Sequence, residues 1–296
     1  MTGTALILGR TGRFGRHAAE AFRNAGWHVR FFNRSSDDIV ARASGVDVIV
    51  NGLNPPYPQW AEIVPEITAR IIAAAKASGA TVLVPGNVYV YGPDSPELLH
   101  EKTIHLATNP LGRARIEMET AYRDAGVPTI LLRAGDFIDT RPSRNWFDLV
   151  VGDDLISYPG RLDAAHAWAF LPDLARAATD LAAQRDSLDL FEEVPFPGYT
   201  LTGSDLATAV GRATGRVPRV KQMTWLPLQL AQPFWPMAKG LLEMRYLWNK
   251  AHRLDGTRFA TLLPDFAPTP LTEALTTALS KGDVHPDETV ARSLSA

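Results

Sequence analysis

Three glycines spaced three residues apart lie close to the start of the chain. Gly9, Gly12 and Gly15 follow the apolar run Ala5–Leu8 and begin a segment with helical spacing of apolar residues. In a dinucleotide-binding turn, the first glycine allows a tight turn, the second lets the backbone approach a pyrophosphate, and the third lets the helix pack on the strand. The N–H groups at the start of that helix attract phosphate. We therefore expect a dinucleotide to contact Gly9, Arg10, Thr11, Gly12, Arg13, Phe14 and Gly15.

The residues after the second predicted strand, His28–Phe32, indicate which dinucleotide binds. NAD-binding folds usually place an acid here for the ribose 2′-hydroxyl, but this chain has Asn33, Arg34 and two serines. A guanidinium suits a 2′-phosphate because it offers planar, bidentate donors. We expect Asn33 and Arg34 to hold that phosphate, with Arg10 within reach, so the predicted cofactor is NADP rather than NAD. The alternative is that Arg34 is a solvated loop residue.

Predicted strands alternate with predicted helices over the first two thirds of the chain. Further strands are predicted at 46–50, 81–84 and 128–132, with a helix at 112–125, and an edge strand at 187–191. This alternation predicts an α/β fold with a Rossmann-type doubly wound parallel sheet. Gly52 and Leu53 follow a strand and are expected beside the cofactor, because ligands bind beyond strand ends in such sheets.

The remaining segments predict a smaller C-terminal substrate-binding lobe. We assign 1–138 and 167–194 to the NADP-binding domain, 139–166 and 195–283 to the lobe, and 284–296 to a disordered tail. The segment 140–167 is expected to be irregular, and Thr202 with Asp205 resembles a capping box. The apolar segment 224–248 either packs over the crevice or forms an apolar substrate pocket or a subunit interface, in which case the chain would be a homodimer.

Composition excludes several partners. The net charge of −2 over 296 residues argues against nucleic acid. The absence of cysteine excludes disulfides and thiolate metal sites, is compatible with a cytoplasmic location, and leaves no metal expected. No apolar run approaches the ~20 residues that span a bilayer, so no membrane partner is expected. The first strand begins at once, which leaves no room for a signal peptide.

Four stretches together resemble the extended and atypical short-chain dehydrogenase/reductases. They are GRTGRFG at 9–15, VPGNVYVYG at 84–92, LLRAGDFI at 131–138 and AWAFLPDLARA at 167–177. That superfamily includes nucleotide-sugar epimerases, dehydratases and reductases. The resemblance implies a nicotinamide cofactor and a substrate bound beyond the strand ends.

The catalytic residues that the resemblance implies are only partly present. The family's Ser or Thr, which bonds the substrate oxygen, is Asn87 here. The family's Tyr and the Lys four residues later correspond to Leu111 and Arg115. Leucine has no proton to donate. Arg115 could hold the nicotinamide ribose but stays protonated, and Asn87 could donate an amide N–H to a carbonyl.

Few groups remain to supply a proton. Tyr91 lies in the family's Val-Tyr-Gly triplet, where a structural role is the alternative. Asp136 follows the strand at 128–132 and could act through water, or could instead bind loop N–H groups. His166 comes from the lobe and is otherwise a packed residue. Arg133 is expected to pair with Asp136 or Asp173, or to bind an anionic group.

Two functions follow from these residues. One is an NADP-dependent oxidoreductase or epimerase-like enzyme acting on a small or moderately apolar carbonyl compound. The other is a non-catalytic NADP-binding redox sensor similar to the NmrA-like branch, for which Leu111 and Arg115 are no handicap.

The cofactor prediction is tested at Arg34. We expect NADPH to bind more tightly than NADH, and Arg34→Asp to reverse that preference, because a carboxylate repels a 2′-phosphate and accepts from a 2′-hydroxyl. Isothermal titration calorimetry with both nucleotides measures this. Equal affinities for the two nucleotides in the natural chain would remove the argument from Arg34.

Overall fold

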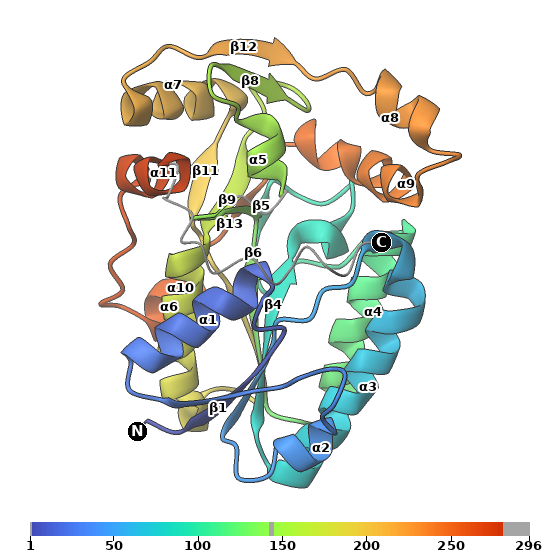
Figure 1. Cartoon of the computed structure of the whole chain (residues 1–296), viewed down its shortest axis with the longest axis vertical. Coiled ribbons are helices and arrows are strands. Elements are labelled where there is room, and N and C mark those ends of the chain that lie inside the picture. Colours follow the sequence, from blue (N-terminus) through green and yellow to red (C-terminus); the bar gives the residue numbers. More distant parts are fainter. Residues whose placement is uncertain (1, 142–144, 281–296) are drawn as a thin grey trace.

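The computed structural model describes residues 2–141 and 145–280. Figure 1 shows a sheet covered by helices on both faces, with a second group of elements beyond one end of the sheet. The tail predicted at 284–296 lies outside the described residues. The predicted fold class is confirmed.

The central sheet has six parallel strands in the order β10-β6-β4-β3-β1-β2. Their bounds are β1 Thr4–Leu8, β2 His28–Phe31, β3 Val48–Asn51, β4 Thr81–Asn87, β6 Thr129–Ala134 and β10 Phe191–Pro195. The predicted edge strand at 187–191 was placed too early, because residues Arg185–Ser187 form a 3₁₀ turn, η3. β3 and β6 are buried along their whole length, as expected for strands covered on both faces.

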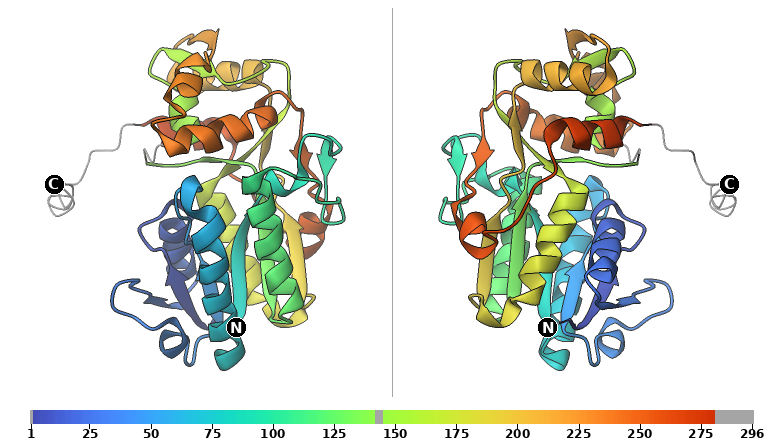
Figure 2. Two further views of the ribbon diagram at one scale, coloured as in Figure 1. Left: turned by 90° about the vertical axis from the view of Figure 1, so that its right-hand side faces the viewer. Right: turned by 90° about the vertical axis from the view of Figure 1, so that its left-hand side faces the viewer.

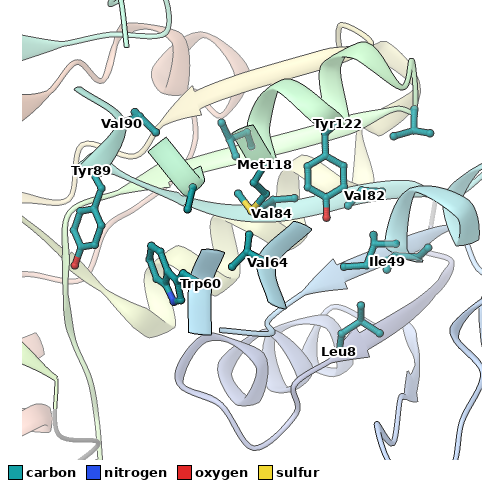
Figure 3. Close-up of a cluster of buried hydrophobic side chains, with 14 of the residues drawn as sticks. Leu8, Ile49, Trp60, Val64, Val82, Val84, Tyr89, Val90, Met118 and Tyr122 are labelled. Atoms are coloured by element: carbon teal, nitrogen blue, oxygen red, sulfur yellow. The ribbon is translucent and has the colours of Figure 1, made fainter. Parts of the chain in front are cut away.

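Two layers of helices bury the two faces of this sheet (Figure 1). One layer contains α1 (Arg13–Asn24) and α6 (Leu171–Ala183), which pack against each other. The other contains α2 (Ile39–Arg42), α3 (Trp60–Ser78) and α4 (Pro110–Asp124). Figure 3 shows the apolar cluster under α3 and α4, in which Val64, Met118 and Tyr122 meet Ile49, Val82 and Val84.

The second group of elements forms a lobe beyond the carboxyl ends of the strands (Figure 2). Three small sheets hold it together, β11-β9-β7, β12-β8 and β13-β5. Its strands are β5 Leu98–Leu99, β7 Asp136–Ile138, β8 Leu155–Tyr158, β9 His166–Phe170, β11 Tyr199–Leu201, β12 Arg219–Gln222 and β13 Arg253–Leu254. Its helices are α5 Trp146–Val150, α7 Gly203–Thr214, α8 Leu226–Ala231, α9 Pro236–Glu243 and α11 Leu271–Leu279, whereas α10 Thr257–Leu262 packs against β10 at the edge of the central sheet.

Helix capping explains one success and one failure of the sequence analysis in this lobe. Thr202 and Asp205 form the predicted capping box at the start of α7. A second capping box, Asn145 with Asp148, starts α5 inside the segment that was expected to be irregular. That expectation was wrong, because the short helix and strand β8 lie between turns rich in charged residues. Within the described residues no helix is long and apolar enough to cross a membrane.

The turn after β1 generates a stability prediction. A Cβ built on Gly15 would overlap the carbonyl oxygen of Gly9, whereas one on Gly12 would lie 3.1 Å from that oxygen. Gly15→Ala must therefore move α1 away from β1, and we expect a loss of about 2 kcal/mol in the free energy of unfolding. Gly12→Ala should lose clearly less. Urea unfolding of both variants measures the difference, and equal losses would contradict the packing argument.

Candidate active site

The backbone beyond β1 and β3 forms a cradle without side chains. The strand order reverses between these two strands, and the crevice at such a switch point is where doubly wound sheets bind ligands. Gly9 has φ of +73°, and a Cβ there would lie 2.6 Å from the carbonyl oxygen of Gly52. A Cβ on Gly52 would lie 2.6 Å from the carbonyl oxygen of Leu8. Gly9, Gly15 and Gly52 thus bring three backbone segments into direct contact.

The start of α1 is open to an anion. Its N-cap is Gly12, which provides no side-chain cap, and no acidic residue lies in the first turn. Helix N–H groups and the helix dipole there favour a phosphate. The cradle and this helix start fit the pyrophosphate of a dinucleotide, as the glycine spacing predicts.

The residues after β2 leave Arg34 exposed while its acidic neighbours are engaged. Asp38 caps α2 by accepting from the N–H of Ala41. Asp37 accepts from the N–H of Asn33, which holds the pKa of the Asp37 carboxyl below its usual range. The guanidinium of Arg10 lies 5.5 Å from the centre of the Phe31 ring at the end of β2. Both acids are thus engaged by the backbone of their own loop.

Arg115 is buried at the family's lysine position. Its guanidinium lies over the Trp60 ring at 4.0 Å and donates to Asn54 Oδ1 at 2.6 Å. Leu111 is buried one turn earlier, and its N–H donates to the Glu243 carboxylate from α9. The predicted contact of Arg115 with a nicotinamide ribose stays a prediction, since protein groups hold two sides of this cation.

Asn87 and Tyr91 occupy different environments. Asn87 accepts from the N–H of Tyr89 through Oδ1, at 3.0 Å, and so caps the 3₁₀ turn η2 (Val88–Tyr91). Tyr91 is 1% exposed, and its ring packs against the guanidinium of Arg133 at 5.1 Å. Its ring also meets the edge of His105. This placement gives Tyr91 a packing role, whereas the catalytic role proposed from the sequence requires contact with substrate.

Arg133 is fully buried in a network of charges. Its guanidinium donates to Glu119 at 2.8 Å, to Glu193 at 2.7 Å and to the carbonyl oxygen of Asn87 at 2.5 Å. The structural pairing expected for Arg133 is present, but the expected partners, Asp136 and Asp173, were wrong. His105, Glu119 and Glu193 cluster closely enough to suggest a metal site, yet the positive charge among them is that of Arg133.

Two phenols face each other in the turns that follow β3 and β4. The hydroxyls of Tyr57, from η1 (Tyr57–Gln59), and Tyr89, from η2, lie 2.7 Å apart. Figure 3 shows Tyr89 beside Trp60, which stacks on it with ring centres 6.1 Å apart. Burial raises the pKa of Tyr57 to about 12 and that of Tyr89 well above its usual value. The Arg115 cation acts on both phenols in the opposite direction.

Asp136 faces the same crevice and holds a histidine of the lobe. Its carboxylate lies 2.7 Å from Nε2 of His166, whose ring stacks on Trp248 at 4.1 Å. His252 packs edge-on against His166 at 4.6 Å. The negative charge of Asp136 also contributes to the raised pKa values of Tyr57 and Tyr89. The predicted action of Asp136 through water therefore competes with a direct bond to His166.

Sequence reasoning missed the phenol pair. Tyr57 lies in the Asn54–Tyr57 stretch after β3, which carries no motif, and its partner is 32 residues further on. The available signal was position alone, since both tyrosines follow strands whose ends line the crevice.

Comparison with known proteins supports the fold and goes no further. No family model matches the sequence, and no curated protein sequence matches it significantly. Many solved structures match the fold. A UDP-N-acetylglucosamine 4-epimerase from Bacillus cereus is 15% identical, with 94% of this chain and 98% of that chain covered and a TM-score of 0.71.

Two further structures illustrate the range of these similar proteins. A dTDP-4-dehydrorhamnose reductase from Yersinia enterocolitica is 18% identical, with 94% and 98% of the two chains covered and a TM-score of 0.68. MoeE5, solved with UDP-glucose and NAD, is 17% identical, with 93% and 97% covered and a TM-score of 0.70. The chain thus shares its Rossmann-type fold with these structures.

Two buried histidines generate a prediction about pH. Burial lowers the pKa of His252 to about 3, and burial together with Arg133 lowers that of His105 to about 4. Below pH 6.5, the usual pKa of an exposed histidine, the unfolded chain binds protons that the folded chain does not. The free energy of unfolding therefore decreases as the pH is lowered. At pH 5 each histidine should cost about 2 kcal/mol relative to pH 7.

Urea unfolding at pH 7 and pH 5 tests this prediction. In His252→Asn the difference between the two pH values should shrink by about 2 kcal/mol, because the variant lacks the titrating group. The difference is the measured quantity, so a general loss of stability does not affect it. A variant that keeps the pH dependence of the natural chain would contradict the buried position of His252.

Proposed function

We propose that the chain is an NADP-dependent oxidoreductase or epimerase-like enzyme acting on a small or moderately apolar carbonyl compound. The observation that carries the proposal is the hydrogen-bonded pair of Tyr57 and Tyr89 under the Arg115 cation, five residues along the chain from the glycine cradle at Gly52. The resemblance predicts Leu111 where the family has its catalytic tyrosine. Tyr57 and Tyr89 supply phenols near Arg115 from other segments of the chain.

A nicotinamide cofactor, when bound, supplies the hydride. The protein must then deliver a proton to the oxygen that gains charge. Because burial raises the pKa of both phenols, to about 12 for Tyr57, both are neutral near pH 7. A developing alkoxide is more basic than a phenolate, so a proton moves from the contacting phenol to the oxygen, and the second phenol stabilises the charge left behind. Tyr57, the more exposed of the two, is the better donor.

The raised pKa values also determine which proton transfer the two phenols can perform near pH 7. Near pH 7 both phenols hold their protons, which is the form that reduction of a carbonyl requires, whereas oxidation of an alcohol would require a phenolate as base. The carboxylate of Asp136 reinforces this by disfavouring a second negative charge nearby. Arg115 offsets part of the cost, in the role that the family gives to lysine.

Asn87 is suited to polarise the carbonyl. Its Oδ1 is committed to the N–H of Tyr89, so its Nδ2 is the group left to donate. This retains the oxyanion-type role that the sequence predicted for Asn87. The aromatic rings of Tyr57, Trp60 and Tyr89 next to it favour a substrate with an apolar body.

One observation favours the second candidate, a non-catalytic NADP-binding redox sensor. Arg115 is held by Trp60 and Asn54, and Leu111 is bonded to Glu243, so both positions are stable without substrate. A sensor needs only the cradle and the phosphate-binding residues, and an NmrA-like function would use those alone. Activity decides between the two candidates.

The test compares tyrosine variants in NADPH oxidation with a panel of aldehydes and ketones. Tyr57→Phe and Tyr89→Phe should each lower turnover by about 100-fold or more, since each removes a hydroxyl from the proposed proton path. Calorimetric affinity for NADPH should not change. Tyr122→Phe is the matched control, because its buried hydroxyl bonds Asn51 under the α3–α4 layer.

Two outcomes would contradict the proposal. Full activity in both phenylalanine variants would remove the phenol pair from the mechanism. No oxidation of NADPH with any carbonyl compound, while NADPH still binds, would favour the sensor. Asn87→Ala should lower turnover as well. An unchanged turnover would contradict the proposal that Asn87 polarises the substrate carbonyl.

A further inference from the structure

The segment 224–248 divides into a buried half and an exposed half. Trp225, Met244 and Trp248 are at most 5% exposed: the two tryptophans belong to the core of the lobe, and Met244 packs in the apolar cluster under α3 and α4. The middle of the segment is different, since Leu226 is 56% exposed and Phe234 is 90% exposed. The predicted alternative of a lobe packed over the crevice therefore accounts for only part of these apolar residues.

The exposed apolar side chains lie on one face of α8 and the turn that follows. Leu226 and Leu230 are four residues apart in α8, which places them on one side of that helix, and Phe234 and Trp235 are exposed in the turn that follows it. Leu228 points the other way and packs on the lobe core. We call these four residues, Leu226, Leu230, Phe234 and Trp235, the α8 face. In Figure 1 the connection between α8 and α9 projects outward from the lobe.

The surroundings of the α8 face are cationic. Residues 216–250 contain six basic residues and a single acid, Glu243, in a chain whose net charge is −2. Glu243 is already bonded to Asn109 and Leu111. Lys221 and Lys239 are exposed, and no ion pair is found for them in the described part of the chain. The projecting apolar residues are thus accompanied by exposed lysines, of which Lys239 lies on α9, the helix that packs against α8.

We propose that the α8 face binds the surface of a membrane containing anionic lipids. Phe234 and the leucines would insert among the acyl chains, Trp235 would lie at the headgroup level, and the lysines would meet lipid phosphates. A second copy of the chain fits less well, because a symmetric contact would bring like cationic borders together. The proposal departs from the sequence-based expectation of no membrane partner, which rested on the lack of a spanning segment.

Trp235 provides a built-in probe for this proposal. The chain has seven tryptophans, and the other six are at most 8% exposed. With vesicles of phosphatidylcholine and phosphatidylglycerol, the full chain should show a blue shift of its fluorescence and quenching by brominated lipids. Both signals should be weak with phosphatidylcholine alone and should decrease as salt is added. Trp235→Phe should abolish the signals while the chain still sediments with the vesicles.

Paired variants separate the apolar contribution from the charge. Leu230→Ser with Phe234→Ser should abolish sedimentation with the vesicles, whereas Leu190→Ser, which changes a leucine 59% exposed elsewhere, should not. Lys221→Gln and Lys239→Gln should each weaken partitioning about fivefold. Lys102→Gln, at an exposed lysine in the turn after β5, is the matched control.

Three results would overturn the proposal. The first is no binding to anionic vesicles, and the second is binding that survives the Leu230→Ser and Phe234→Ser changes. The third is self-association of the natural chain, measured by light scattering, that these two changes abolish while vesicles have no effect. That last result would assign the α8 face to a dimer. None of these outcomes depends on the proposed enzymatic activity.

Discussion

Three backbone segments meet beyond β1 with no space for a side chain between them. Gly9, Gly15 and Gly52 each lie so close to a neighbouring carbonyl group that any Cβ would overlap it or force it away. This close approach seats α1 directly on the end of the sheet and leaves its first N–H groups uncapped. The binding cradle and the packing of the first helix are therefore one feature, and everything proposed about a dinucleotide depends on it.

Burial of Arg133 sets a second constraint, at the other side of the crevice. The guanidinium joins Glu119 of α4, Glu193 of β10 and the end of β4 at Asn87. Removing one partner of such a network leaves a buried charge without compensation, which costs several kcal/mol. Because Arg133 fixes the carbonyl group of Asn87, it also fixes the start of η2 and thus the position of Tyr89. The Arg133 network takes no direct part in the proposed reaction, but it positions Tyr89, to which we assign a role in proton transfer.

Like the Tyr/Lys pair of the family that the sequence resembles, the proposed site has a phenol near a cation, but the phenols come from different positions in the chain. Arg115 lies where the sequence resemblance predicts the family's lysine, and its charge acts on Tyr57 and Tyr89. Tyr57 also touches the lobe, because a Cβ on Gly240 of α9 would collide with its ring. Helix α9, which packs against Tyr57, begins directly after Trp235 of the α8 face. The lobe therefore connects the proposed active site with the proposed membrane-binding surface.

The sequence by itself determined the alternation of strands and helices, the glycine turn and the cap at Thr202, because each depends on neighbours within a few residues. The family's catalytic positions, with no proton donor at Leu111, are predictions from the sequence resemblance and stay predictions. Only the tertiary structure decided that Tyr57 meets Tyr89, that Arg133 pairs with Glu119 and Glu193, and that His166 meets Asp136. These partners lie 14 to 60 residues apart. No local pattern encodes them, since long-range pairing follows from the order of strands in the sheet and from which groups burial forces to find a partner.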